Sequence, residues 1–196
     1  MKNRSILAMA VVLAGAAAIG VAQGQTNAAF GTLLEGTRGM DNFIQEGNAN
    51  WRPMGGDSIG ASIGNGYLVT KESYGDFRLR AEVWVDTPAN SGIFIRCQNP
   101  GDIGANTCYE VNLFDTRPGQ EYATGGIVNT ARVIGQPKAG GKWNVMEIIA
   151  KGPMLTVMLN GVKTAEASDP KLPQGRIALQ YGNGDVKFRK VEIMRN

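Results

Sequence analysis

The residues best suited to chemistry lie in the segment Glu110-Val111-Asn112-Leu113-Phe114-Asp115. The chain contains no histidine, so a Ser-His-Asp triad and a histidine-ligated zinc site are excluded, and catalysis falls to carboxylates, other side chains or an oxygen-ligated metal. In a regular strand Asp115 points away from Glu110, but a one-residue β-bulge after Asn112 turns both carboxylates to one face. Paired carboxylates suit glycosidic bond cleavage, because one can stay protonated while the other acts as base or nucleophile.

A structural role explains the same two carboxylates equally well. Glu110 and Asp115 are then ordinary exposed strand residues, or they form ion pairs with Arg96 or Arg80. The spacing alone does not separate these two interpretations.

Three successive segments around this motif show the alternation of half-buried strands. In 77–85 apolar residues alternate with charged and aromatic ones, and 92–97 and 109–114 repeat the pattern. If these strands pair with one another, their polar faces form one sugar-binding surface. That surface contains Arg80, Glu82, Trp84, Phe94, Arg96, Glu110 and Asn112. Trp84 and Phe94 then either stack on a sugar ring or pack within the sheet.

Cys97 and Cys108 are the only cysteines in the chain. In an oxidising compartment they are expected to form a structural disulfide that closes the loop 98–107. For a loop of about 10 residues, the chain-entropy model gives somewhat under 3 kcal/mol of stabilisation. A redox-active pair would more often be separated by two residues.

The first residues have the layout of a secretory signal peptide, residues 1–22. Lys2 and Arg4 precede an apolar run from Ile6 to Val21, and cleavage is expected after Ala22. The run of about 16 residues is shorter than the roughly 20 of a membrane span, and no cysteine follows it to carry a lipid anchor. We therefore expect a periplasmic or secreted protein with no membrane attachment after signal cleavage.

Composition and turn signals favour one all-β domain over residues 30–196. Short β-rich runs recur between turns, and Asn160-Gly161 is a strong type I′ hairpin signal. The expected fold is a jelly-roll β-sandwich of two antiparallel sheets. Residues 31–63 give the least clear pattern, and 55–64 are expected to form a loop. The net charge of +3 includes Lys2 and Arg4, which leaves +1 without the signal peptide and argues against a nucleic-acid partner.

Several ordered motifs resemble the 3-keto-disaccharide hydrolase domain, a family with a concanavalin A-like lectin/glucanase fold. They are NSGIFIRCQ (90–98), CYEVNLFD (108–115), GKWNVMEIIAKG (141–152), LTVMLNGVKT (155–164) and GRIALQYGNGDVKFRKVEI (175–193), with GYLVTKESYGDFRLRAEVWV (66–85) upstream. The resemblance covers roughly residues 30 to 195. Related lichenases and laminarinases carry Glu-x-Asp-x-x-Glu on their catalytic strand. Here the spacing is kept as Glu110, Asn112 and Asp115, and these replacements argue against an ordinary retaining mechanism.

The resemblance implies cleavage of 3-keto-glycosides or 3-keto-disaccharides by elimination followed by hydration. In this hypothesis Glu110 removes the C2 proton, Asp115 protonates the departing oxygen and Arg96 stabilises the enolate oxygen. Substrate binding is assigned to Asn112, Arg80, Glu82, Trp84, Phe94, Asn90 and Lys71. No cofactor is required by the motifs. A divalent cation near Glu110 and Asp115 is compatible with the spacing, which does not demand one.

The alternative function is a non-catalytic carbohydrate-binding, lectin-like module, because this fold hosts lectins as readily as hydrolases. Either function predicts a carbohydrate partner. The sequence does not identify the sugar, the linkage, the aglycone or the oligomeric state.

Overall fold

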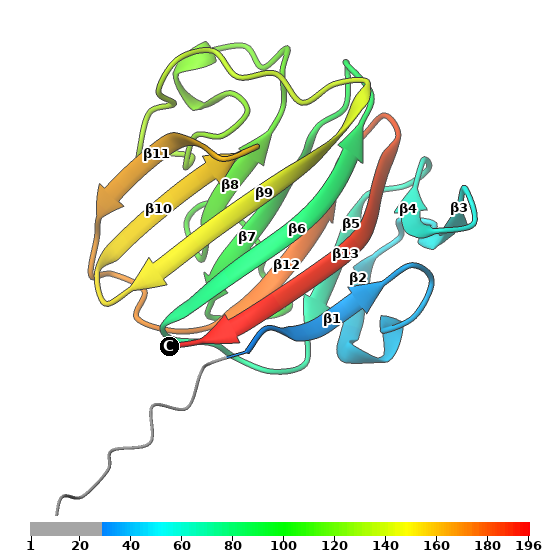
Figure 1. Cartoon of the computed structure of the whole chain (residues 1–196), viewed down its shortest axis with the longest axis horizontal. Helices are drawn as coiled ribbons and strands as arrows, with labels where there is room; N and C mark the ends of the chain where they lie inside the picture. Colours follow the sequence, from blue (N-terminus) through cyan, green and yellow to red (C-terminus); the bar gives the residue numbers. More distant parts are fainter. Residues whose placement is uncertain (1–28) are drawn as a thin grey trace, which may run out of the picture.

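The computed structural model describes residues 29–196, which form two antiparallel β-sheets packed face to face (Figure 1). The all-β jelly-roll prediction is confirmed, and the proposed signal peptide, residues 1–22, lies outside the described residues. Among residues 29–196, no helix is long and apolar enough to cross a membrane.

The eight-stranded sheet, here called sheet A, is nearer the viewer in Figure 1. Its order is β11-β10-β9-β6-β13-β4-β3, and β1 also pairs with β13. The bounds are β1 (Gly31–Glu35), β3 (Arg52–Met54), β4 (Ser58–Ala61), β6 (Phe77–Val85), β9 (Lys142–Lys151), β10 (Met154–Leu159), β11 (Val162–Ser168) and β13 (Val186–Arg195).

The five-stranded sheet, sheet B, lies behind it in the order β2-β5-β12-β7-β8. Its strands are β2 (Phe43–Gly47), β5 (Gly66–Thr70), β7 (Ser91–Cys97), β8 (Tyr109–Leu113) and β12 (Arg176–Tyr181). Two short 3₁₀ helices, η1 (Met40–Asn42) and η2 (Gln120–Tyr122), lie in the connections. Strand β4 corrects the expectation that 55–64 form a loop throughout.

The main core lies between the sheets, and alternation along the strands fills it. In β6, Phe77, Leu79, Ala81 and Val83 are fully buried, whereas the residues that alternate with them are half-buried on the outer face of sheet A. The hairpin signal is also confirmed, because β10 and β11 pair antiparallel across Asn160 and Gly161, which both have positive φ.

Strand β7 departs from simple alternation, because every one of its residues is buried. A second apolar cluster covers the outer side of sheet B at this point. It contains Val69, Phe94, Cys97, Cys108 and Ala178, with Tyr67 and Ile103 packed against it. Sheet B therefore carries packed side chains on both of its faces near the centre.

Candidate active site

The residues of sheet B that face away from the main core form two rows across neighbouring strands. One row runs Tyr67, Gln180, Gly92 and Asn112. Tyr67 pairs with Gln180, and Gly92 pairs with Asn112. Gln180 lies beside Gly92, because the preceding residue Leu179 pairs with Ile93. The next row runs Val69, Ala178, Phe94 and Glu110. We call these two rows the sheet B face.

Glu110 is the carboxylate of the sheet B face. Its side chain is half-buried, and burial raises the pKa of the carboxyl group, although the positive charge of Arg117 opposes this rise. A carboxylate with a raised pKa is a stronger base when ionised and holds a proton closer to neutral pH. Glu110 is therefore suited to moving a proton in either direction.

Asn112 is held firmly beside Glu110 and is 0% exposed. Its Nδ2 donates to the Tyr122 backbone oxygen at 2.6 Å. Its backbone nitrogen donates to the Gly126 oxygen at 3.0 Å, and its backbone oxygen accepts from the Gly125 nitrogen at 2.8 Å. The Gly125-Gly126 segment thus completes the hydrogen bonding of the edge strand β8, and it fixes the position of the Asn112 amide.

Phe94 lies in the centre of the sheet B face but is only 2% exposed. Its ring packs edge-on against the ring of Tyr67, with centroids 5.4 Å apart. The expectation that Phe94 offers a stacking surface to a sugar is therefore wrong. Phe94 packs beside Tyr67, and Tyr67 is the half-buried aromatic residue of this face.

The predicted surface shared by seven residues does not exist. Strand β6 pairs with β9 and β13 in sheet A, so Arg80, Glu82 and Trp84 lie on the opposite side of the sandwich from Glu110. Their side chains are engaged there. Arg80 binds Glu147 at 3.1 Å, Glu82 binds Arg189, and the Lys187 ammonium lies 3.8 Å from the Trp84 ring centroid.

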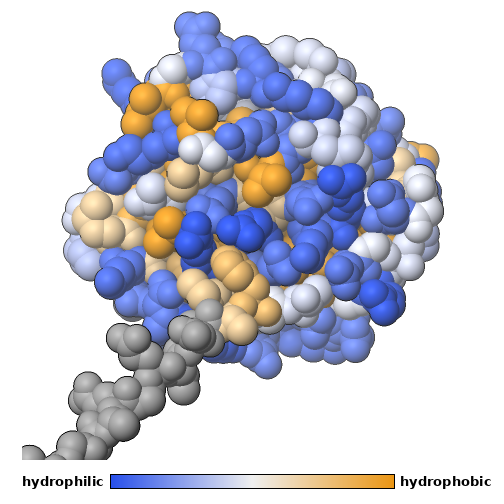
Figure 2. Space-filling model, in the orientation of Figure 1, coloured by the Kyte–Doolittle hydropathy of each residue, from blue (hydrophilic) through white to orange (hydrophobic). Residues whose placement is uncertain are grey.

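Figure 2 shows this outer face of sheet A, where hydrophilic and hydrophobic residues are intermixed. The physical reason for the error is that alternation identifies which side of a strand is polar, and it does not identify the sheet to which the strand belongs. The proposed substrate-binding roles of Arg80, Glu82 and Trp84 are incompatible with a site at Glu110.

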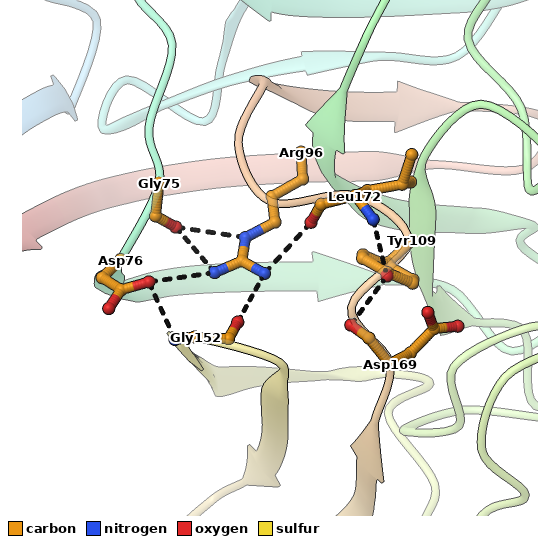
Figure 3. A network of polar contacts seen from close by, with 7 residues as sticks. All are labelled: Gly75, Asp76, Arg96, Tyr109, Gly152, Asp169 and Leu172. Atoms are coloured by element: carbon orange, nitrogen blue, oxygen red, sulfur yellow. Dashed lines mark hydrogen bonds and ion pairs between the residues drawn. The ribbon is translucent and has the colours of Figure 1, made fainter.

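Arg96 is also misplaced by the sequence pattern. Its φ angle is +54°, and the register of β12 against β7 shifts between Arg176 and Ala178. These two irregularities turn the Arg96 side chain away from the outer face of sheet B. The side chain is 0% exposed. It donates to the backbone oxygens of Gly75 (3.1 and 3.0 Å), Gly152 (2.9 Å) and Leu172 (3.1 Å), and it pairs with the Asp76 carboxylate at 3.2 Å (Figure 3). Arg96 is a structural clamp and does not reach the sheet B face.

Asp115 follows β8 and does not turn toward Glu110. The register of β8 against β7 is regular from Tyr109 to Leu113, without the bulge predicted after Asn112. The Asp115 carboxylate, 7% exposed, instead accepts hydrogen bonds from the Thr124 hydroxyl at 2.6 Å and the backbone nitrogens of Ala139 (3.0 Å) and Gly140 (2.9 Å). Its oxygens are thus used to join two loops, and the predicted acid role is not supported.

The two remaining predicted binding residues lie in different places. Asn90 comes just before β7, two residues from Gly92, and its backbone nitrogen donates to the Asn183 Oδ1 at 2.8 Å, so it borders the sheet B face. Lys71 is exposed after β5 and lines a separate pocket of about 450 Å³ together with Tyr74 and Arg195. That pocket shares no lining residue with the sheet B face.

Tyr67, Gln180 and Arg117 are the functional candidates that the sequence analysis missed. In β12, Gln180 is a single polar residue between the buried residues Leu179 and Tyr181, and this was the available signal. Within residues 29–196, no group of three or more His, Cys, Asp or Glu side chains gathers in a way that could hold a metal.

Comparison with known proteins assigns the chain to a family. Residues 29–194 match the family described as the 3-keto-alpha-glucoside-1,2-lyase-like domain. The chain belongs to this family. The resemblance found in the sequence motifs is thereby confirmed. No curated protein matches this member by sequence.

Solved structures share the fold of this family member at low identity. A protein provisionally named as a glycosyl hydrolase from Parabacteroides distasonis is 23% identical, with a TM-score of 0.72 over 86% of this chain and 100% of that one. Carbohydrate binding module CBM66 from Bacillus subtilis is 13% identical, with a TM-score of 0.61 over 82% and 96% of the two chains. The exoplasmic/lumenal domain of VIP36, in a Ca²⁺/Man-bound form, is 8% identical, with a TM-score of 0.60 over 84% and 89%. The family and its structural neighbours support a carbohydrate-active role.

The predicted disulfide of this family member is confirmed. Cys97 and Cys108 are bonded, and the loop between them brings Ile103 against the second apolar cluster. The Tyr67 hydroxyl donates to the Ile103 backbone oxygen at 3.4 Å. The bridge therefore positions one border of the sheet B face as well as stabilising the fold.

Replacing both cysteines by serine is expected to lower the free energy of unfolding by about 2–3 kcal/mol, because the unfolded chain regains the entropy of an open loop. Urea unfolding of the oxidised protein and of the double variant measures this difference. Reducing agent should lower the stability of the wild-type protein to a similar extent and leave the variant unchanged. An equal effect of reducing agent on both proteins would contradict this role of the disulfide.

The raised pKa of Glu110 predicts a pH-dependent stability difference between the wild-type protein and Glu110→Gln. Because the folded state raises the pKa above its unfolded value, the stability that protonated Glu110 contributes is present at low pH and is lost as pH rises through the folded-state pKa. Glutamine mimics the protonated form, so the variant should gain stability relative to the wild type at neutral pH and lose that gain in acid. Melting temperatures of both proteins across this range test the prediction, and a difference that does not vary with pH would contradict it.

Proposed function

We propose that this chain cleaves the glycosidic bond of 3-keto-glycosides, with Glu110 as the proton-transferring residue. The observation that carries the proposal is a half-buried carboxylate of raised pKa on the sheet B face, beside the fixed amide of Asn112. Membership in the 3-keto-alpha-glucoside-1,2-lyase-like family supports this choice of substrate.

The chemistry follows from the ketone at C3 of the sugar. The ketone acidifies the C2 proton, which Glu110 removes, and the electron pair of the C2–H bond forms an enolate with negative charge on the C3 oxygen. The enolate collapses to a C1–C2 double bond as the C1–O bond breaks, and the departing oxygen takes that electron pair together with a proton. Water then adds to the resulting enol ether at C1, which completes a net hydrolysis.

Because Arg96 and Asp115 do not face the sheet B face, other residues take their roles in the proposed reaction. Arg117 replaces Arg96 as the cation for the enolate oxygen, since its charge acts on Glu110 and its Nε has no partner among residues 29–196. Glu110 itself replaces Asp115 as the acid, because after removing the C2 proton it is the protonated carboxyl group of the sheet B face. A raised pKa serves both halves of this transfer.

A direct assay tests the proposed reaction. The protein is incubated with a chromogenic 3-keto-glucoside and, separately, with the matching unoxidised glucoside, with and without a divalent metal ion, and aglycone release is followed. Release from the keto sugar alone is the expected result. Equal release from both sugars would indicate an ordinary glycosidase and would contradict the elimination route.

A carbohydrate-binding function without catalysis is the second candidate. It is favoured by the buried amides of Gln180 and Asn112, which could hold a sugar without any proton transfer. A binding module and a Man-bound lumenal domain among the structural neighbours share this fold. Sugar binding without aglycone release would select this function.

We also propose that the protein is exported. The predicted signal peptide at residues 1–22 and the disulfide between Cys97 and Cys108 both suit an oxidising compartment. The N-terminal sequence of the protein recovered from the cell envelope or the medium tests this, and a sequence starting at Met1 would contradict it.

A further inference from the structure

Two buried side-chain amides lie on either side of Gly92 on the sheet B face. Gln180 is 8% exposed and Asn112 is 0% exposed. Neither Gln180 Oε1 nor Asn112 Oδ1 has a hydrogen-bond partner among residues 29–196, although both atoms are buried. A buried acceptor left without a donor lowers the stability of the fold, so two of them in adjacent positions indicate a role beyond stability.

Asn112 has its amide nitrogen engaged, and Gln180 has its oxygen beside Gly92, so the directions of the two oxygens are defined. Asn112 Nδ2 donates to the Tyr122 backbone oxygen. Burial raises the pKa of Tyr67, and the neighbouring Gln180 amide lowers it in part. The Tyr67 hydroxyl in turn donates to the Ile103 oxygen. Rotating the Asn112 amide would break its bond to Tyr122, and Gln180 Oε1 lies toward Gly92, so each side chain carries an unpaired oxygen on the sheet B face.

Gly92 is buried and carries no side chain between the two oxygens. A Cβ atom at Gly92 would lie 3.0 Å from the Val111 backbone oxygen, 3.4 Å from Gln180 Oε1 and 3.5 Å from the Phe94 ring. Asn112 is the direct cross-strand neighbour of Gly92 on the other side. The absence of a side chain here allows a ligand to approach the backbone closely between the two acceptors.

We propose that Gln180 and Asn112 form an acceptor pair that binds two hydroxyl groups of the sugar over Gly92. This rests on the proposed carbohydrate site, and it assigns the orientation of the substrate. A ketone oxygen accepts hydrogen bonds and cannot donate one, so the C3 carbonyl is excluded from the acceptor pair and faces Arg117. The acceptor pair therefore selects sugars by the hydroxyl groups that they retain.

Binding of unoxidised sugars tests the acceptor pair without any turnover. The probes are methyl α- and β-D-glucopyranoside and their monodeoxy analogues, with affinities measured by calorimetry. Removing a hydroxyl held by the pair should weaken binding by about 10- to 100-fold, because the buried acceptor is left unpaired. Removing the C3 hydroxyl should have no such effect.

Gln180→Met is more informative than a substitution of Asn112, because Asn112 also donates a hydrogen bond to the backbone of the Tyr122 loop. Methionine has a similar shape and removes the acceptor. The variant should bind the parent glucoside about 10- to 100-fold more weakly, and one deoxy analogue should bind the variant and the wild type equally. Its melting temperature without sugar should not fall, whereas a merely structural glutamine would lower it. Gln45→Met on β2, an exposed residue that donates to the Ala49 oxygen, is the matched control and should keep wild-type affinity.

Gly92→Ala provides a second variant that keeps both amides. The added methyl group occupies the position between the acceptors and should abolish sugar binding in a protein that still unfolds cooperatively. Unchanged affinity in both Gln180→Met and Gly92→Ala would overturn the acceptor pair, as would a wild-type protein that binds none of the glucosides. Loss of binding in Gln180→Met, in a protein that never releases aglycone from the keto sugar, would support the pair and overturn only the proposed reaction.

Discussion

Glu110→Gln should lower kcat/KM for a chromogenic 3-keto-glucoside by about 10²–10⁴-fold, the usual contribution of a positioned general base. The amide keeps the size of the side chain but cannot accept the C2 proton. Binding of the unoxidised glucoside should change little, because the acceptor pair of Gln180 and Asn112 is untouched. Steady-state kinetics together with calorimetry separate these two effects.

Glu82→Gln is the matched control for that variant. It makes the same change from carboxylate to amide on the opposite side of the sandwich, where Glu82 pairs with Arg189. Activity should remain at the wild-type level.

The wild-type pH profile of kcat/KM should also show an acid limb at a higher pH than an ordinary glutamate gives, because burial raises the Glu110 pKa. Full activity of Glu110→Gln would refute the proposed mechanism.

Arg96→Met should be the most destabilising single substitution discussed here, with an expected loss of about 3–5 kcal/mol in the free energy of unfolding. The guanidinium joins the backbone oxygens of Gly75, Gly152 and Leu172, which come from three separate connections of the chain (Figure 3). Methionine fills similar space but leaves those oxygens without a donor. Urea denaturation measures the loss.

Arg80→Met is the comparison for this substitution. Arg80 is partly exposed on sheet A, and its ion pair with Glu147 should contribute at most about 1 kcal/mol. Arg96→Lys should not restore stability, because a single ammonium group cannot reproduce the planar fork that reaches three directions. If Arg96→Met unfolded at the same urea concentration as Arg80→Met, the clamp would have no energetic importance.

Local features were predictable wherever neighbouring residues along the chain decide them. Alternation in 77–85 identified the buried side of β6, Asn160-Gly161 identified a hairpin, and two cysteines in one short segment identified the disulfide. The strands β1 to β4 were the poorly predicted part, because all four are short and most residues of β1, β2 and β3 are exposed or partly exposed. The apolar run Ile93-Phe94-Ile95 in β7 was also a signal, since a strand buried on both sides loses alternation.

The sequence by itself therefore determined the fold class, the family motifs, the disulfide and the placement of Glu110 and Asn112 on one face of one strand. Only the tertiary structure decided which strands share a sheet. It placed Arg80, Glu82 and Trp84 on the opposite side of the sandwich from Glu110. It placed Gln180 and Tyr67 on the same face as Glu110. It also decided the direction of Arg96 through one positive φ angle. The physical reason is that a period of two records burial along one strand, whereas pairing between strands depends on contacts between residues far apart in the chain.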